Sequence, residues 1–165
     1  MKVLLEQEEV SLDKPHGSGL THLVYAALGG HRGVVKISLE QEEVGPVKLN
    51  GGHRTPLSYG AWAGREGVVK ILLKWDEVNS DKPDNGGKTP LSDGMLKGHE
   101  GVVKILLKRE KINPDRLHND GWTPLLFGAS KGQVGVVKVF LEAEEVNPDV
   151  PDNVRGTLLL HAPWT

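Results

Sequence analysis

The chain has 165 residues, of which 38% are hydrophobic and 25% are charged, a composition typical of a folded protein with a core rather than a disordered one. The formal net charge of −2 excludes the strongly basic surface that DNA or RNA binding requires. The absence of cysteine excludes disulfides, thiolate nucleophiles and cysteine-ligated metals.

The N-terminal stretch MKVLLEQEEV has an apolar run of only three residues, which is too short for the hydrophobic region of a signal peptide. No apolar run approaches the length needed to cross a membrane, because a lysine interrupts each block that resembles VVKILL. We therefore expect no membrane partner and a location in the cytoplasm or the nucleus.

The sequence repeats with a period of 34 residues. Threonines recur at this spacing, at Thr21, Thr55, Thr89, Thr123 and Thr157. A Gly-Val-Val-Lys block recurs in the same register, starting at Gly33, Gly67, Gly101 and Gly135. A fixed period of this length indicates an array of one supersecondary unit. We expect a single domain over 1–165, made of a partial unit (1–20), four complete units (21–54, 55–88, 89–122 and 123–156) and a truncated unit (157–165).

Each complete unit predicts two helices and a turn. Thr55 is a good helix N-cap and Pro56 suits the first helical position, so we expect a short helix over 56–63 and its counterpart over 90–97. Gly64 is then expected to end the helix in a left-handed conformation. The second helix of each unit is apolar around most of its circumference, so neighbouring units must cover it on more than one side.

The third complete unit carries the full pattern: Asp84-Asn-Gly-Gly87-Lys-Thr89-Pro-Leu-Ser-Asp-Gly94, then Gly98-His99, then Val102-Val103-Lys-Ile-Leu106-Leu107. This pattern resembles the ankyrin repeat, and the resemblance covers the whole chain. It implies an all-α solenoid of stacked helix-turn-helix units with hairpin-like turns. The period is one residue longer than the usual 33, as in fungal-type arrays with a Val-Asn-Pro-Asp loop. The resemblance also implies that the rings of His31 and His99 hydrogen-bond between turns and hold successive units together.

Several residues depart from the family pattern. Gly60, Gly94 and Gly128 replace an alanine in the first helix, and each costs about 1 kcal/mol of helix propensity. Ser38 stands where the other units carry a leucine or a phenylalanine, and His53 replaces a turn glycine, which strains the backbone if φ is positive there. We expect the first complete unit to be the weakest.

The segment Gly87-Lys88-Thr89 matches the end of a phosphate-binding loop, which raises a nucleotide-binding alternative. The loop would also need a glycine at position 82, which is a lysine, and the equivalents of Lys88 include a leucine and a tryptophan. No metal-ligand cluster and no paired catalytic carboxylates appear either. We expect no catalytic residue, no metal site, no cofactor and no enzymatic activity.

Ankyrin arrays usually bind partners on a concave face, which is formed by the turn tips and the exposed side of the first helices. Matching positions predict a partner-binding surface made of Arg54, Tyr59, Trp62, Lys88, Leu96, Lys97, Trp122, Ser130 and Lys131. Tryptophan, tyrosine and arginine are enriched at interface hot spots. We expect Trp62 and Trp122 to be exposed, whereas Tyr59 and Phe127 either border the surface or pack between units. The basic residues favour an acidic or mixed partner.

Two functions remain open at the level of sequence. The first is a non-catalytic protein–protein interaction module that binds a partner protein on its concave face. The alternative is a structural spacer, a fragment of a longer ankyrin array within a multidomain protein that carries a nucleotide-hydrolysing sensor domain.

Overall fold

The computed structural model describes residues 20–40, 52–144 and 146–150. Within these ranges the chain forms eight α-helices and no strand, which confirms the predicted all-α class. The helices are α1 (His22–Gly29), α2 (Arg32–Glu40), α3 (Pro56–Trp62), α4 (Glu66–Leu72), α5 (Pro90–Lys97), α6 (Glu100–Leu107), α7 (Pro124–Ser130) and α8 (Val134–Leu141). The partial units expected at the two ends lie outside the described residues, apart from Leu20.

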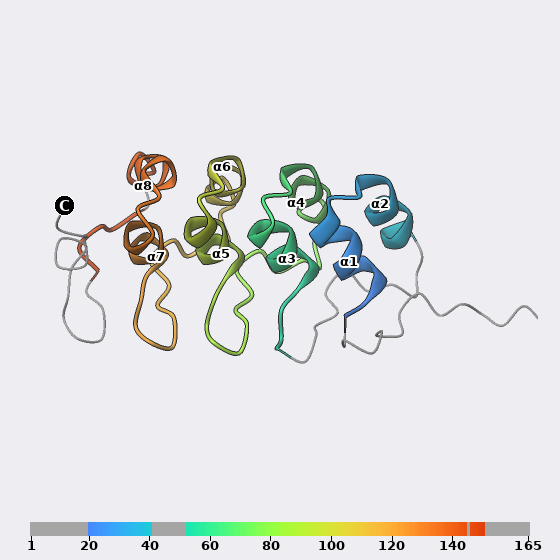
Figure 1. The fold of residues 1–165 in the computed structure, drawn as a ribbon, viewed down its shortest axis with the longest axis horizontal. Helices are drawn as coiled ribbons and strands as arrows, with labels where there is room; N and C mark the ends of the chain where they lie inside the picture. Colours follow the sequence, from blue (N-terminus) through green and yellow to red (C-terminus); the bar gives the residue numbers. More distant parts are fainter. Residues whose placement is uncertain (1–19, 41–51, 145, 151–165) are drawn as a thin grey trace, which may run out of the picture.

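The helices form two parallel rows (Figure 1). The first helices α1, α3, α5 and α7 contact one another in chain order, and the second helices α2, α4, α6 and α8 form the other row. Each first helix also contacts the second helix that follows it. The contacts of each helix pair are therefore mainly with its neighbours, as in a solenoid. None of the described helices is long and apolar enough to span a membrane.

Threonine caps begin all four first helices. Thr21, Thr55, Thr89 and Thr123 have extended backbones, and each hydroxyl accepts a hydrogen bond from the amide three residues later. At the head of α5, Ser92 Oγ also accepts from the Thr89 amide at 2.7 Å, which completes a capping box. The predicted N-caps are confirmed.

Glycines with a positive φ end the first helices. Gly64 and Gly98 have φ values of 69° and 76°, as expected for left-handed helix stops. His53 also has a positive φ, of 60°, where the equivalent turn residue Gly87 has a φ of 87°. The backbone strain expected at His53 is therefore confirmed, because a side chain disfavours this conformation.

The core runs through the whole row of units. Val68, Val102 and Val136 occupy equivalent positions on α4, α6 and α8, and each is at most 1% exposed. Ser38 on α2 is also buried, in a position that Leu72, its equivalent on α4, fills with a larger apolar side chain. Stacking thus buries the apolar second helices as expected, with less apolar volume in the first complete unit.

Hydrogen bonds tie each unit to the previous one. In the turns, the Asn85 amide donates to the Gly52 carbonyl and the Asn119 amide donates to the Gly86 carbonyl, both at 3.1 Å. At the break between helices, His99 Nε2 lies 3.0 Å from the carbonyl oxygen of Trp62, which confirms the bond expected for this histidine. The ring of His31 instead lies over Gly29 of its own unit.

Candidate partner-binding surface

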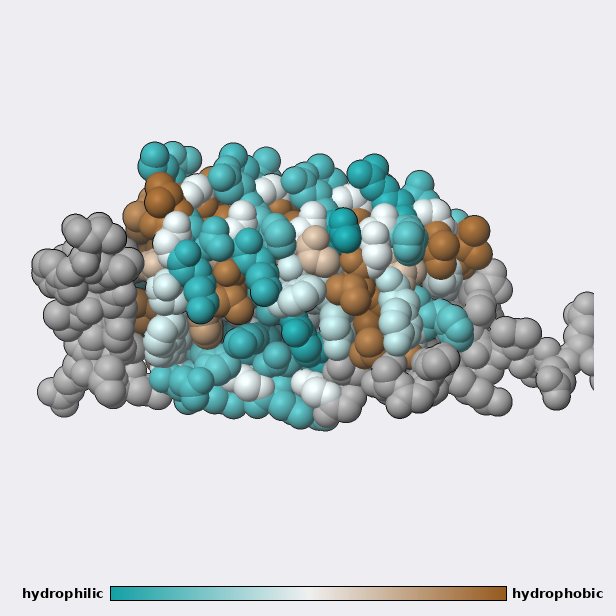
Figure 2. All heavy atoms as spheres, in the orientation of Figure 1, coloured by the Kyte–Doolittle hydropathy of each residue, from teal (hydrophilic) through white to brown (hydrophobic). Residues whose placement is uncertain are grey.

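Eight of the nine residues predicted to bind a partner fall at two recurring places in the unit, and the ninth, Tyr59, lies in the middle of α3. Arg54, Lys88 and Trp122 each end a turn and directly precede a capping threonine. Trp62 and its equivalents lie at the C-terminal ends of the first helices. The 34-residue spacing therefore arranges these side chains in two lines that run across the stack. Figure 2 shows hydrophilic side chains along the turns, below the helices.

Exposure differs along this surface. Trp62 is 38% exposed, and Lys97 and Lys131 are also exposed, which confirms the expectation for Trp62. Trp122 is half-buried, so the expectation that it is exposed is confirmed only in part. The remaining members are also half-buried: Arg54, Tyr59, Lys88, Leu96 and Ser130.

Trp62 and Lys97 form an exposed pair that joins two units. Lys97 Nζ, at the end of α5, lies 4.6 Å from the centre of the Trp62 ring at the end of α3. A lysine over a tryptophan face at this distance is a cation–π contact. The contact presents a broad aromatic surface next to a positive charge, and it holds both side chains in place.

Arg54, at the end of the turn before α3, contacts α5, the next first helix. Its guanidinium lies 4.9 Å from the centre of the Tyr59 ring and forms an ion pair with the Asp93 carboxylate. Asp93 lies in the first turn of α5 and is 1% exposed. Burial raises the pKa of Asp93 from 3.8 to about 6, although the charge and the hydrogen bond of Arg54 act in the opposite direction.

Phe127 lies at the centre of a third cluster. Lys88 Nζ, in the turn before α5, is 5.7 Å from the centre of the Phe127 ring, and the rings of Trp122 and His118 each lie 5.4 Å from it. Phe127 is half-buried between these side chains, which supports its packing between units. Trp122 covers one side of this packed ring.

The model for the family of ankyrin repeats (3 copies) matches residues 1–82 and 76–152. The chain belongs to the ankyrin-repeat family. No curated protein matches the sequence. Ankyrin repeats are generally protein–protein interaction modules and are typically non-catalytic. Among the described residues, no group of three or more histidine, aspartate or glutamate side chains is placed to hold a metal ion.

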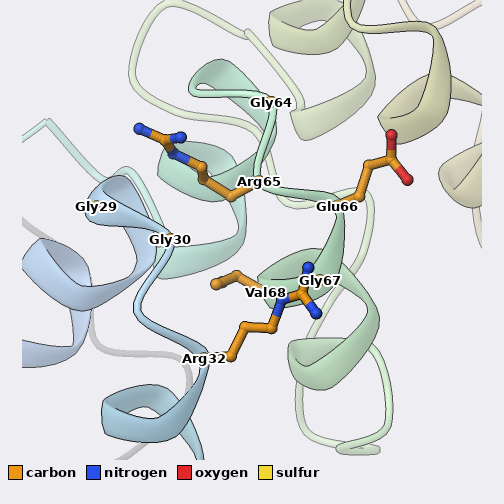
Figure 3. A pocket seen from close by; sticks show the side chains of 8 residues that line it. All are labelled: Gly29, Gly30, Arg32, Gly64, Arg65, Glu66, Gly67 and Val68. Atoms are coloured by element: carbon orange, nitrogen blue, oxygen red, sulfur yellow. The ribbon is translucent and has the colours of Figure 1, made fainter.

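The ankyrin array has a pocket between its first two complete units, where the helix breaks meet (Figure 3). The Arg65 side chain extends over the end of α1, and its Nε donates to the Leu28 carbonyl at 3.0 Å. This is the bond that His99 makes one unit later. The Arg32 side chain extends over Gly67. Arg65 thus links the two units in the way that His99 does, and we assign no ligand to this pocket.

The sequence did not indicate the ion pair between Arg54 and Asp93. Two signals were present: an aspartate stands where Tyr59 and Phe127 supply aromatic rings in other units, and an arginine ends the preceding turn. An aspartate at a half-buried aromatic position needs a positive partner, and the only way to name that partner is to know which side chains face each other across two units.

Proposed function

We propose that this ankyrin array binds an acidic segment of a partner protein on the surface that contains Trp62, Lys97 and Lys131. The observation that carries the proposal is the exposed pair of Trp62 and Lys97 on adjacent first helices. Tryptophan is among the residues that most often dominate binding energy at protein interfaces. A structural spacer has no need for such a pair in contact with solvent.

The charges on this surface favour an acidic partner. Lys97 and Lys131 are exposed, whereas Asp93, the carboxylate that borders this surface, is buried against Arg54. The Asp84 carboxylate accepts hydrogen bonds from the Gly86 and Lys88 amides of its own turn. Electrostatic complementarity mainly contributes specificity and a faster association rate.

The test is affinity capture with two variants of matched charge, compared by quantitative mass spectrometry. The first variant combines Lys97→Glu with Lys131→Glu on the proposed surface. The control combines Lys104→Glu with Lys138→Glu, which are exposed on the second helices α6 and α8. Some proteins will be enriched by both the wild type and the control. The captured amount of these proteins should be at least about tenfold lower with the first variant, which corresponds to a loss of about 1.4 kcal/mol of binding free energy.

Trp62→Ala should also lower the captured amount of these proteins, although it does not change the charge of the surface. The proposal is wrong if the Lys97 and Lys131 variant retains the wild-type set, or if both lysine variants lose that set equally. Circular dichroism of each variant shows whether the helical stack is intact.

A further inference from the structure

The second helices at the two ends of the stack expose side chains that the inner units bury. Val34 on α2 is 50% exposed, although its equivalents on α4, α6 and α8 are at most 1% exposed. Ile37 is 61% exposed, whereas its equivalent Ile71 packs against the core. At the opposite end, Leu141 on α8 is 46% exposed, although its equivalent Leu39 is 4% exposed. Each end thus presents one half of the contact that joins neighbouring units.

A glycine near the start of each second helix makes room for a side chain of the previous unit. Arg32 lies over Gly67, Glu66 lies over Gly101 and Glu100 lies over Gly135, so closely that a Cβ would not fit. At the first of these glycines, Gly33 on α2, a Cβ would meet no atom of the described residues within 4 Å. Within the described part of the chain, nothing fills the space over Gly33.

The side chain that would fill such a space at the other end is apolar. Val134 occupies on α8 the position of Arg32, Glu66 and Glu100, and it is 62% exposed. Helix α8 thus carries a valine where the other second helices carry a charged residue, and Figure 2 shows hydrophobic surface over both α2 and α8.

We propose that the α8 end of one copy of this chain docks on the α2 end of a second copy. The contact continues the α2–α4, α4–α6 and α6–α8 contacts from one molecule to the next. Val134 of the first copy lies over Gly33 of the second, and Leu141 packs toward Val34 and Ile37. This head-to-tail interface uses two different surfaces, so it can extend beyond a dimer. It uses the ends of the second-helix row and is independent of the proposed partner-binding surface.

The test is sedimentation analysis of the full chain over a range of concentrations, with one variant for each end. Leu141→Lys blocks the α8 end by placing a charge at an exposed apolar position. Ile37→Lys blocks the α2 end at an exposed position. We expect the average mass of the wild type to rise with concentration and each variant alone to remain a monomer. An equimolar mixture of the two variants should form a complex of two chains and nothing larger, because each variant retains one open end.

Three results would overturn the proposal. The wild type could remain a monomer up to high micromolar concentration, which would mean that neither end binds a second copy. Either variant could still associate alone, which would mean that like ends meet. The equimolar mixture could fail to form the two-chain complex. The Lys97→Glu and Lys131→Glu variant is the control: it should associate like the wild type, which separates this proposal from partner binding.

Discussion

At the residue scale, Asp93 has an environment unlike that of its equivalents. It is buried in the first turn of α5 and paired with Arg54, whereas Tyr59 and Phe127 place rings at this position. Removing one partner of a buried ion pair leaves the other charge uncompensated, which is costly. The net effect on stability depends on whether the carboxylate is ionised.

Asp93 predicts a specific pH dependence. Its pKa is about 6 in the folded protein and 3.8 without burial, so the folded state holds the proton more tightly. The resulting stabilisation is complete below pH 3.8 and is lost as pH rises through about 6. The shift corresponds to about 3 kcal/mol. Relative to Asp93→Asn, the wild type should lose about this much free energy of unfolding between pH 4 and pH 7, as measured by urea denaturation.

The Asp93→Asn variant retains every other titratable group, including Asp81, whose pKa burial also raises. The difference between the two profiles of unfolding free energy against pH therefore isolates the contribution of Asp93. Parallel profiles would show that its carboxylate is not buried as the structure places it.

The residues that the sequence predicted correctly act locally. Thr55 and Thr89 bond to an amide three residues away, and Gly64 ends its own helix, so their roles follow from a few neighbouring positions. Arg54 and Asp93 lie 39 residues apart, and their pairing depends on how two units face each other. The half-burial of Trp122 was also not predicted, although the Phe127 ring on which it packs lies near it in the sequence.

At the scale of the element, the first helices share a weak point. Gly60 in α3 and Gly128 in α7 stand where α1 carries Ala26, a better helix former. A Cβ at Gly60 would meet side chains of α4 at 3.5 Å and 3.6 Å, which is ordinary contact. A Cβ at Gly128 would come within 3.0 Å of Met95 Cε. The same substitution therefore has room in α3 and is crowded in α7.

Gly60→Ala should raise the free energy of unfolding by about 0.5–1 kcal/mol, because alanine restricts the unfolded chain and favours the helix. Gly128→Ala should gain clearly less, because Met95 must move. Urea denaturation of both variants alongside the wild type measures the difference. Equal gains would contradict the packing described around Met95, and a loss at Gly60 would contradict the room described in α3.

The links between elements tolerate changes of residue type. Arg65 and His99 occupy equivalent positions, and both bond to a carbonyl near the end of the preceding first helix. A sequence pattern that requires histidine there would miss Arg65, although its guanidinium Nε reaches the same kind of acceptor. The contact between helices therefore depends on the available donor more than on the residue.

At the scale of the whole molecule, stability depends on contacts between neighbouring units. In such stacks the total stability is approximately the sum of the intrinsic stabilities of the single units and the free energies of the interfaces between them. Helices α4 and α6 have a described second helix on both sides, whereas α2 has one on a single side and carries the small Ser38 in its buried face. The first complete unit should therefore open most easily.

Hydrogen exchange followed by mass spectrometry, at a concentration low enough for monomers, tests the stacked architecture most directly. We predict that the amides of α4 and α6 exchange most slowly and that those of α2 exchange much faster, because neighbouring units supply most of the protection. Equal protection of α2, α4 and α6 would contradict a stack of mutually supporting units, and so would faster exchange in α4 than in α2.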